Sequence, residues 1–175
     1  MIASKIPPSV SPSAPDSAYR LGIGLMVLNS KKQVFVGKRA DLDVSKDKVA
    51  PWQMPQGGVD YGEDPYLAAL REMKEEIGTD AVTLLAQTPE WIYYDLPKEI
   101  AKKLWGGRFV GQKQLWYLFQ YDGYDTNINV HTSHPEFCEW KWIDPIELPN
   151  IIVSFKHDLY TYLVNEFKDQ LKIDV

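Results

Sequence analysis

Three carboxylates, Glu72, Glu75 and Glu76, lie within five residues of one another in the stretch 56–80, QGGVDYGEDPYLAALREMKEEIGTD. A fourth carboxylate, Glu63, lies just ahead of them. Like charges three or four residues apart in a helix cost roughly 0.2–0.5 kcal/mol per pair. Something in the folded protein should therefore offset their repulsion.

The carboxylates fall in a segment that predicts a helix. Asp64 followed by Pro65 is a typical helix start, with the acid as N-cap and the proline in the first turn, and Gly78 supplies a stop. The helix should span about residues 65–77. At roughly 100° per residue the three glutamates share one ridge, which we expect to be exposed. The opposite side should face the core through Leu67, Leu70, Met73 and Ile77.

Two interpretations of this ridge are open from spacing alone. The first is a solvated acidic face, partly neutralised by Arg71 pairing with Glu75 four residues on. The second is a site for a hard divalent cation. Mg²⁺ prefers oxygen ligands and usually takes one or two carboxylates, leaving its other positions to water and phosphate oxygens.

The surrounding residues resemble the signature of the Nudix hydrolase family. Gly57 is followed after five residues by Glu63, and after seven more by the run REMKEEIG at 71–78. The one departure is Thr79, where the family pattern has an aliphatic residue, and this change leaves the carboxylates in place. A match of this length is far more specific than a lone glycine-rich loop.

The resemblance implies an α/β Nudix fold, with a mixed β-sheet sandwiched between helices. It also implies hydrolysis of a nucleoside diphosphate linked to another group, with Mg²⁺ or Mn²⁺ as cofactor. Such a reaction needs cations because a polyphosphate is densely anionic and repels an attacking water. The implied metal ligands are Glu72, Glu75, Glu76 and the main-chain carbonyl of Gly57. Glu75 and Glu76 would serve catalysis together with Arg71, which would orient one of the ligands.

Outside this motif the chain resembles the bacterial RNA pyrophosphohydrolases and (di)nucleoside polyphosphate hydrolases. The stretches that carry the resemblance are YRLGIG, WQMPQGG, GQKQLWYLF, HPEFCEWKWID and IVSFK. The implied substrates are 5′-triphosphorylated RNA ends, diadenosine polyphosphates, or both. Both contain a nucleoside attached to a polyphosphate, and the sequence does not choose between them.

This second resemblance implies five substrate-binding residues. Arg20 and Arg39 would contact phosphates, for which the guanidinium fork is well suited. Gln114 or its strand neighbours would line the cleft, and Phe155 and Lys156 would hold a base. Without the resemblance, the sequence would predict that the two arginines are solvated and that Phe155 is a core residue.

Glu136 is the remaining candidate. The resemblance implies that it faces the acidic helix from a distant strand or loop, where it would bind a metal or accept a proton from water. The alternative is an ordinary surface glutamate. The histidines do not predict a zinc site, because their spacing is irregular and they fall in expected loops: His131, His134 and His157.

Composition limits the remaining possibilities. The net charge of −5 argues against a broad nucleic-acid-coating surface, so we expect a nucleotide or an RNA 5′ end as partner and not DNA. No run of 18 apolar residues occurs, so no membrane segment is expected and we predict a cytoplasmic protein. The single cysteine, Cys138, excludes an internal disulfide.

The chain divides into a predicted flexible tail over residues 1–18, rich in proline and serine, and one domain over residues 19–175. Trp140 and Trp142 alternate along an expected strand and should pack into the core on the same side. We expect a polar loop at 40–51 and a closing helix at 154–171. The expected strands are 19–29, 32–39, 52–55 (ending in a turn at Gly57 and Gly58), 82–96, 112–123 and 136–144.

Three classes of function are consistent with such a fold: a metal-dependent hydrolase, a catalytically weak nucleotide sensor, and a structural protein. The complete set of Glu72, Glu75 and Glu76 favours the hydrolase, because a sensor does not need every metal ligand.

Overall fold

A computed structural model describes residues 6–41 and 51–173 of the 175-residue chain. Its centre is a mixed eight-stranded sheet with the order β3-β2-β1-β7-β5, in which β4 also pairs with β1, β6 with β7 and β8 with β2. The strands are β1 (Tyr19–Leu28), β2 (Val34–Arg39), β3 (Trp52–Gln53), β4 (Gln56–Gly58), β5 (Val82–Gln87), β6 (Ile92–Asp95), β7 (Gly111–Tyr121) and β8 (Phe137–Ile143).

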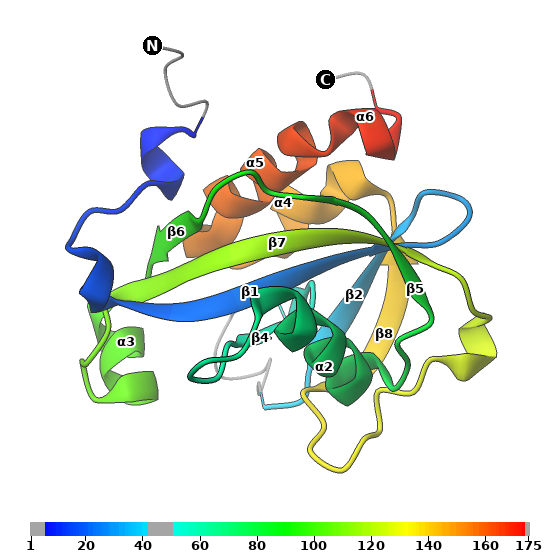
Figure 1. Cartoon of the computed structure of the whole chain (residues 1–175), viewed down its shortest axis with the longest axis horizontal. Helices are drawn as coiled ribbons and strands as arrows, with labels where there is room; N and C mark the ends of the chain where they lie inside the picture. Colours follow the sequence, from blue (N-terminus) through cyan, green and yellow to red (C-terminus); the bar gives the residue numbers. More distant parts are fainter. Residues whose placement is uncertain (1–5, 42–50, 174–175) are drawn as a thin grey trace.

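Helices cover both faces of this sheet (Figure 1). They are α2 (Pro65–Ile77), α3 (Lys98–Trp105), α4 (Leu148–Ile151), α5 (His157–Glu166) and α6 (Lys168–Leu171). Short 3₁₀ turns are η1 (Pro8–Val10), η2 (Asp16–Ala18), η3 (Asp125–Asn127), η4 (Pro145–Glu147) and η5 (Ser154–Lys156). No helix in these described residues is both long and apolar enough to cross a bilayer.

The two central strands, β1 and β7, contribute side chains to the core on both faces of the sheet. β1 and β7 run parallel, in register from Tyr19 opposite Gly111 to Leu28 opposite Gln120. Alternate residues of β1 point to opposite faces, so Met26 joins the core under α4 and α5 while Leu25 joins the core under α2. The predicted sandwich of a mixed sheet between helices is confirmed.

Helix α2 has the predicted ends. The carboxylate of Asp64 accepts hydrogen bonds from the backbone amides of Tyr66, at 2.9 Å, and Leu67, at 3.2 Å. Gly78 ends the helix at a φ of 80°, which glycine adopts without strain. The predicted core face is wrong at Leu67, which is 58% exposed. The neighbouring Ala68 and Ala69 are buried instead, because small side chains let the helix approach the sheet closely.

Gly57 and Gly58 do not form the turn that the sequence predicted. They lie in β4, where Gly57 pairs with Ile23 of β1. Glycine is needed at position 57 because a Cβ there would lie 2.0 Å from the carboxyl carbon of Glu72. Close approach of the acidic helix, rather than turn geometry, therefore requires this residue.

The other elements agree with the prediction in part. The expected closing helix divides into η5, α5 and α6, while its predicted apolar residues Leu159, Leu163 and Phe167 are buried. Trp140 and Trp142 both pack on Phe35, as expected for one side of a strand. Helix α3 was not predicted. Most of the expected loop at 40–51 lies outside the described residues.

Residues 6–18 differ from the expected flexible tail. Val10 has no exposed surface and belongs to the core beneath α5. Asp16 forms an ion pair with Lys113 of β7 at 2.8 Å. Asp95 of β6 accepts hydrogen bonds from Ser13 and Tyr19. The composition suggested disorder, but one buried valine and this set of polar contacts fasten the segment to the sheet edge.

The packing of Val10 predicts a loss of stability when its side chain is truncated. Val10→Ala should lower the free energy of unfolding by about 2 kcal/mol, through lost burial and the cavity left behind. In a chain of this size that corresponds to a fall in Tm of about 4–8 °C. Thermal melts should show this fall for Val10→Ala, while the exposed Ser9→Ala melts like the wild type. Equal melting of both variants would mean that the segment adds nothing to stability.

Candidate metal centre and nucleotide cleft

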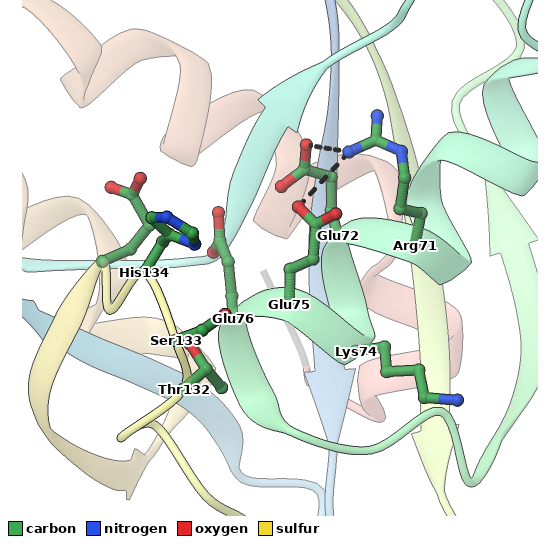
Figure 2. Close-up of a pocket in the computed structure, with 9 residues that line it drawn as sticks. Arg71, Glu72, Lys74, Glu75, Glu76, Thr132, Ser133 and His134 are labelled. Carbon is green, nitrogen blue, oxygen red and sulfur yellow. Dashed lines mark hydrogen bonds and ion pairs between the residues drawn. The ribbon is translucent and has the colours of Figure 1, made fainter.

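A cavity of about 530 Å³ opens between α2 and the loop that leads into β8. Figure 2 shows carboxylates of α2 on one wall and the loop residues on the other, with Lys74 turned away from the carboxylates. The lining residues are Arg71, Glu72, Lys74, Glu75, Glu76, Thr132, Ser133, His134 and Glu136. The structure thus brings Glu136, which is 60 residues beyond Glu76 in the chain, to the same cavity as the acidic helix.

Glu76 is buried, although the sequence predicted an exposed ridge. Only 4% of it is exposed, and its Oε2 has no hydrogen-bond partner among the described residues. Burial raises the pKa of this carboxyl well above its usual value, and the charges of Glu72 and Glu136 raise it further. The prediction failed because β4 and its neighbours cover this part of the helix. An unpartnered buried carboxylate oxygen is a strong reason to expect a cation.

Glu72 is also largely buried and lies against β4. Its side chain is 12% exposed, and its carboxylate occupies the space that a side chain at position 57 would fill. Burial raises the pKa of Glu72, and a hydrogen bond from Arg71 opposes that effect. Glu75 is the exposed member of the three, at 58% of its side chain.

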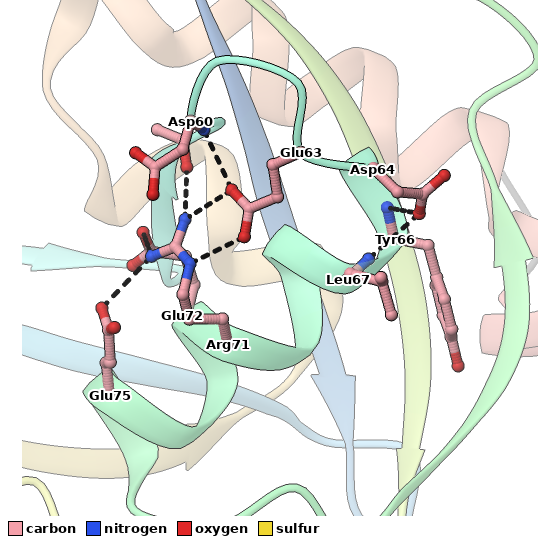
Figure 3. A network of polar contacts seen from close by, with 9 residues as sticks. Asp60, Glu63, Asp64, Tyr66, Leu67, Arg71, Glu72 and Glu75 are labelled. Atoms are coloured by element: carbon pink, nitrogen blue, oxygen red, sulfur yellow. Dashed lines mark hydrogen bonds and ion pairs between the residues drawn. The ribbon is translucent and has the colours of Figure 1, made fainter.

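Arg71 holds these carboxylates in place (Figure 3). Its Nε and Nη2 bind the two oxygens of Glu63, at 2.9 and 3.0 Å, and Nη2 also donates to the carbonyl of Gly58 at 3.0 Å. Its Nη1 contacts Glu72 at 2.8 Å and Glu75 at 3.4 Å. The pair with Glu75 that the sequence predicted is therefore present, but it is the longest of these contacts.

Glu63 is the functional residue whose part in the site sequence reasoning missed. Arg71 and the backbone amide of Asp60 lower the pKa of Glu63 to about 2. The signal was available, because Glu63 occupies a fixed position of the motif eight residues before Arg71. Its partner could not be inferred from helical spacing, since the two residues lie on different elements.

The types of residue in the cavity suit a divalent cation, but their side chains are not arranged as a complete set of metal ligands in the described residues. In residues 6–41 and 51–173, no three His, Cys, Asp or Glu side chains are grouped closely enough to hold a metal ion as they stand. Arg71 keeps Glu72 and Glu75 turned toward itself instead. The unpartnered oxygen of Glu76 and the acidic donor set nevertheless suit the hard, oxygen-preferring cations that the sequence suggested.

The predicted substrate residues border a second part of the site, on β1, β2, β7 and η5. Lys156 is only 6% exposed, and its Nζ donates to Oε1 of Gln56 at 3.3 Å. Burial and the charge of Arg39 lower the pKa of Lys156 to about 7, while Glu76 opposes this shift. The Nζ of Lys156 also lies 5.4 Å from the centre of the Tyr94 ring.

Gln114 does not reach the cleft surface. It is completely buried, donating to Gln112 at 2.9 Å and accepting from the indole of Trp116 at 2.9 Å. A weaker contact of 3.4 Å joins it to Gln56. Gln114 itself therefore lies behind Gln56 and Gln112, and the lining role expected for Gln114 or its strand neighbours stays a prediction.

The remaining predicted residues are placed as follows. Arg39 forms a two-point ion pair with Asp41, at 2.6 and 3.0 Å, which engages its Nε and Nη2. Arg20 lies beside Gly58, where an added Cβ would come within 2.5 Å of its Nη2. Phe155 is half-buried against the core under α5. The structure keeps both roles of Phe155 open, because a half-buried ring has one face to offer.

The fold and the acidic site together define a class of protein. The chain matches the NUDIX domain over residues 18–163, and it belongs to the Nudix family. The family predicted from the motif is confirmed.

The similar proteins are more specific. The chain is 48% identical over 161 residues to the RNA pyrophosphohydrolase of Rhodospirillum rubrum, covering 90% of this chain and 94% of that protein. It is 46% identical over 157 residues to the RNA pyrophosphohydrolase of Rickettsia typhi, with the same two coverages, 90% and 94%.

Two solved structures share the fold at lower identity. The dihydroneopterin triphosphate pyrophosphohydrolase of E. coli matches with a TM-score of 0.59 and 19% identity, over 85% of this chain and 99% of that one. A C. elegans Ap4A hydrolase in a binary complex matches with a TM-score of 0.57 and 20% identity, over 85% and 98%. At these identities the likeness concerns the fold alone.

The contact between Gly57 and Glu72 can be tested without changing a carboxylate. Gly57→Ala should push the Glu72 carboxylate out of place and weaken activation by Mg²⁺ by about 10–100-fold, as loss of a supporting contact does at other metal sites. A Mg²⁺ titration of activity measures this effect. Tyr61→Ala is the control, because Tyr61 is fully exposed in the next loop. Unchanged Mg²⁺ dependence in Gly57→Ala would contradict the placement of Glu72.

The burial of Glu76 predicts an opposite effect on stability with and without metal. Without metal, Glu76→Gln should raise Tm, because it removes a charge that burial disfavours. At a Mg²⁺ concentration about 100 times its Kd, the wild type should gain about 2.7 kcal/mol and the variant much less. Melts in EDTA and in Mg²⁺ test both points, with the exposed Glu75→Gln melting like the wild type in EDTA. A lower Tm of Glu76→Gln in EDTA would contradict this account.

Proposed function

We propose that the protein is a divalent-metal-dependent pyrophosphohydrolase that acts on 5′-triphosphorylated RNA ends. It would release pyrophosphate and leave a 5′-monophosphorylated RNA. The observation that carries the proposal is the buried carboxylate oxygen of Glu76 that has no hydrogen-bond partner among the described residues, in the lining of the acidic cavity. The names of the two similar bacterial proteins support the choice of RNA as substrate.

Acidic residues would bind the metal ions, and basic residues would bind the substrate. Glu72, Glu75, Glu76 and Glu136 would hold Mg²⁺ or Mn²⁺, with the carbonyl of Gly57 as a further oxygen donor. A bound cation supplies charge neutralisation for the polyphosphate and makes water more acidic. Arg20, Arg39 and Lys156 would bind the phosphates and the first nucleosides. The substrate would thus be held both by the cations on the carboxylates and by these basic side chains.

Hydrolysis between the α- and β-phosphates needs a group that accepts a proton from the attacking water. Glu75 and Glu136 are the exposed carboxylates of the cavity, where water enters, and we assign the proton acceptor to one of them. Glu76 and Glu72 are less suited because they are enclosed. Arg71 would stay anchored to Glu63 and keep the helix aligned with β4 while its other partners turn toward the cation.

The same site argues against a sensor that has lost its chemistry. A protein that only binds a nucleotide has no reason to bury a carboxylate oxygen of Glu76 without a hydrogen-bond partner, since a neutral residue of that size would be more stable there. The intact motif from Glu63 to Glu76 therefore supports an active enzyme. Triphosphorylated transcripts are made in the cytoplasm, and we place the proposed activity there.

Replacement of one carboxylate by its amide tests the proposal directly. Glu75→Gln should lower kcat on a 5′-triphosphorylated RNA by about 10²–10⁴-fold, as the removal of other charge-stabilising groups does. The assay should follow pyrophosphate release and the monophosphorylated product at saturating Mg²⁺. Diadenosine tetraphosphate, assayed beside the RNA, shows which substrate is preferred. The proposal fails if the wild type releases no pyrophosphate from the RNA, and the role of Glu75 fails if its variant keeps normal turnover.

A further inference from the structure

The segment formed by α3 and the loop after it, residues 98–108, is a basic surface on an acidic protein. It carries four basic residues and one acidic residue, whereas the whole chain has a net charge of −5. Lys98, Lys102, Lys103 and Arg108 are all exposed. Ala101 is the only buried residue of the helix, and Leu104 is 55% exposed. Most of the α3 surface is therefore available for contact.

Two aromatic rings at the end of this segment lie between two guanidinium groups. Cζ of Arg20 lies 5.8 Å from the centre of the Trp105 ring, and the Trp105 and Phe109 rings meet edge to face at 5.9 Å. Cζ of Arg108 lies 5.1 Å from the centre of the Phe109 ring. The result is a continuous row from Arg20 through Trp105 and Phe109 to the exposed Arg108.

This row begins at the site already described. Arg20 lies in β1 beside Gly58, and the carbonyl of Gly58 accepts a hydrogen bond from Arg71. Figure 1 shows α3 at the end of the sheet where β1 and β7 begin. The row therefore leads from the acidic helix outward to the basic surface of α3.

We propose that residues 98–108 bind the single-stranded body of the RNA, beyond the nucleotides that occupy the cleft. The proposal rests on the function proposed above. Lys102, Lys103 and Arg108 would contact backbone phosphates, and the half-buried rings of Trp105 and Phe109 would offer stacking surface to bases. Basic side chains combined with aromatic rings are the usual means of holding a single strand without reading its sequence. On this proposal a dinucleotide would be held by the cleft alone, whereas a longer strand would extend onto the surface of α3.

The test compares a short and a long substrate. A 5′-triphosphorylated dinucleotide and a 5′-triphosphorylated 12-mer should be assayed with the wild type and with Lys102→Gln/Lys103→Gln/Arg108→Gln. The variant should raise KM for the 12-mer about tenfold and leave the dinucleotide unchanged. It should also reduce the slope of log KM against log salt for the 12-mer by about 2, since each phosphate contact on a single strand contributes about 0.7.

A matched control carries the same loss of charge elsewhere. Lys31→Gln/Lys168→Gln/Lys172→Gln removes three exposed lysines from the β1–β2 turn and from α6. This control should leave KM for both substrates unchanged. An equal loss on the 12-mer in the control and the α3 variant would overturn the proposal, because only net charge would then matter. An unchanged or equally raised KM for both substrates in the α3 variant would also overturn it, with the proposed enzyme still standing. No hydrolysis of either RNA by the wild type would instead refute the function on which this proposal rests.

Discussion

The guanidinium of Arg71 is the interaction on which the acidic site depends. Two of its nitrogens are fixed by Glu63 and by the carbonyl of Gly58, and the third serves Glu72 and Glu75 together. Because the fixed side does not involve Glu72 or Glu75, these two carboxylates can turn toward a cation while the helix keeps its position against β4. The repulsion that the spacing of the glutamates implies is thus offset before any metal binds.

Glu76 is stabilised in a different way, since no contact with Arg71 reaches it in the described structure. Its enclosure by the sheet disfavours the charged form, and the raised pKa expresses that cost. A bound cation would supply the partner that the Oε2 of Glu76 lacks among the described residues. The site therefore contains two kinds of carboxylate. Glu72 and Glu75 form ion pairs with Arg71. Glu76 does not, and its charged form would be favoured by a nearby positive ion. This difference gives the site a reason to bind metal that an evenly solvated acidic helix would lack.

The sequence predicted the parts of the fold that local chemistry determines. Asp64, Pro65 and Gly78 mark both ends of α2 because capping depends on a few adjacent residues. The burial of Glu76 was not predictable, since helical periodicity shows which residues share a face and not what covers that face. The strand at Gly57 was mistaken for a turn for a similar reason: its glycine is required by a side chain fifteen residues away. Residues 6–18 looked disordered by composition, and one buried valine with one ion pair and a few hydrogen bonds was enough to fix them.

The distribution of charge explains how an acidic protein can act on a polyanion. A uniformly basic surface would attract RNA at every position along its length, and most of those encounters would bring no triphosphate to the cavity. Arg20, Arg39 and Lys156 are the cations that the proposed function assigns to the substrate, and the basic surface of α3 lies next to Arg20. The carboxylates of α2 would repel any phosphate that arrives without a cation. Under the proposed function, productive binding would then require a dense cluster of phosphates at one end of the strand, which is the feature that distinguishes a triphosphorylated 5′ end from the RNA interior.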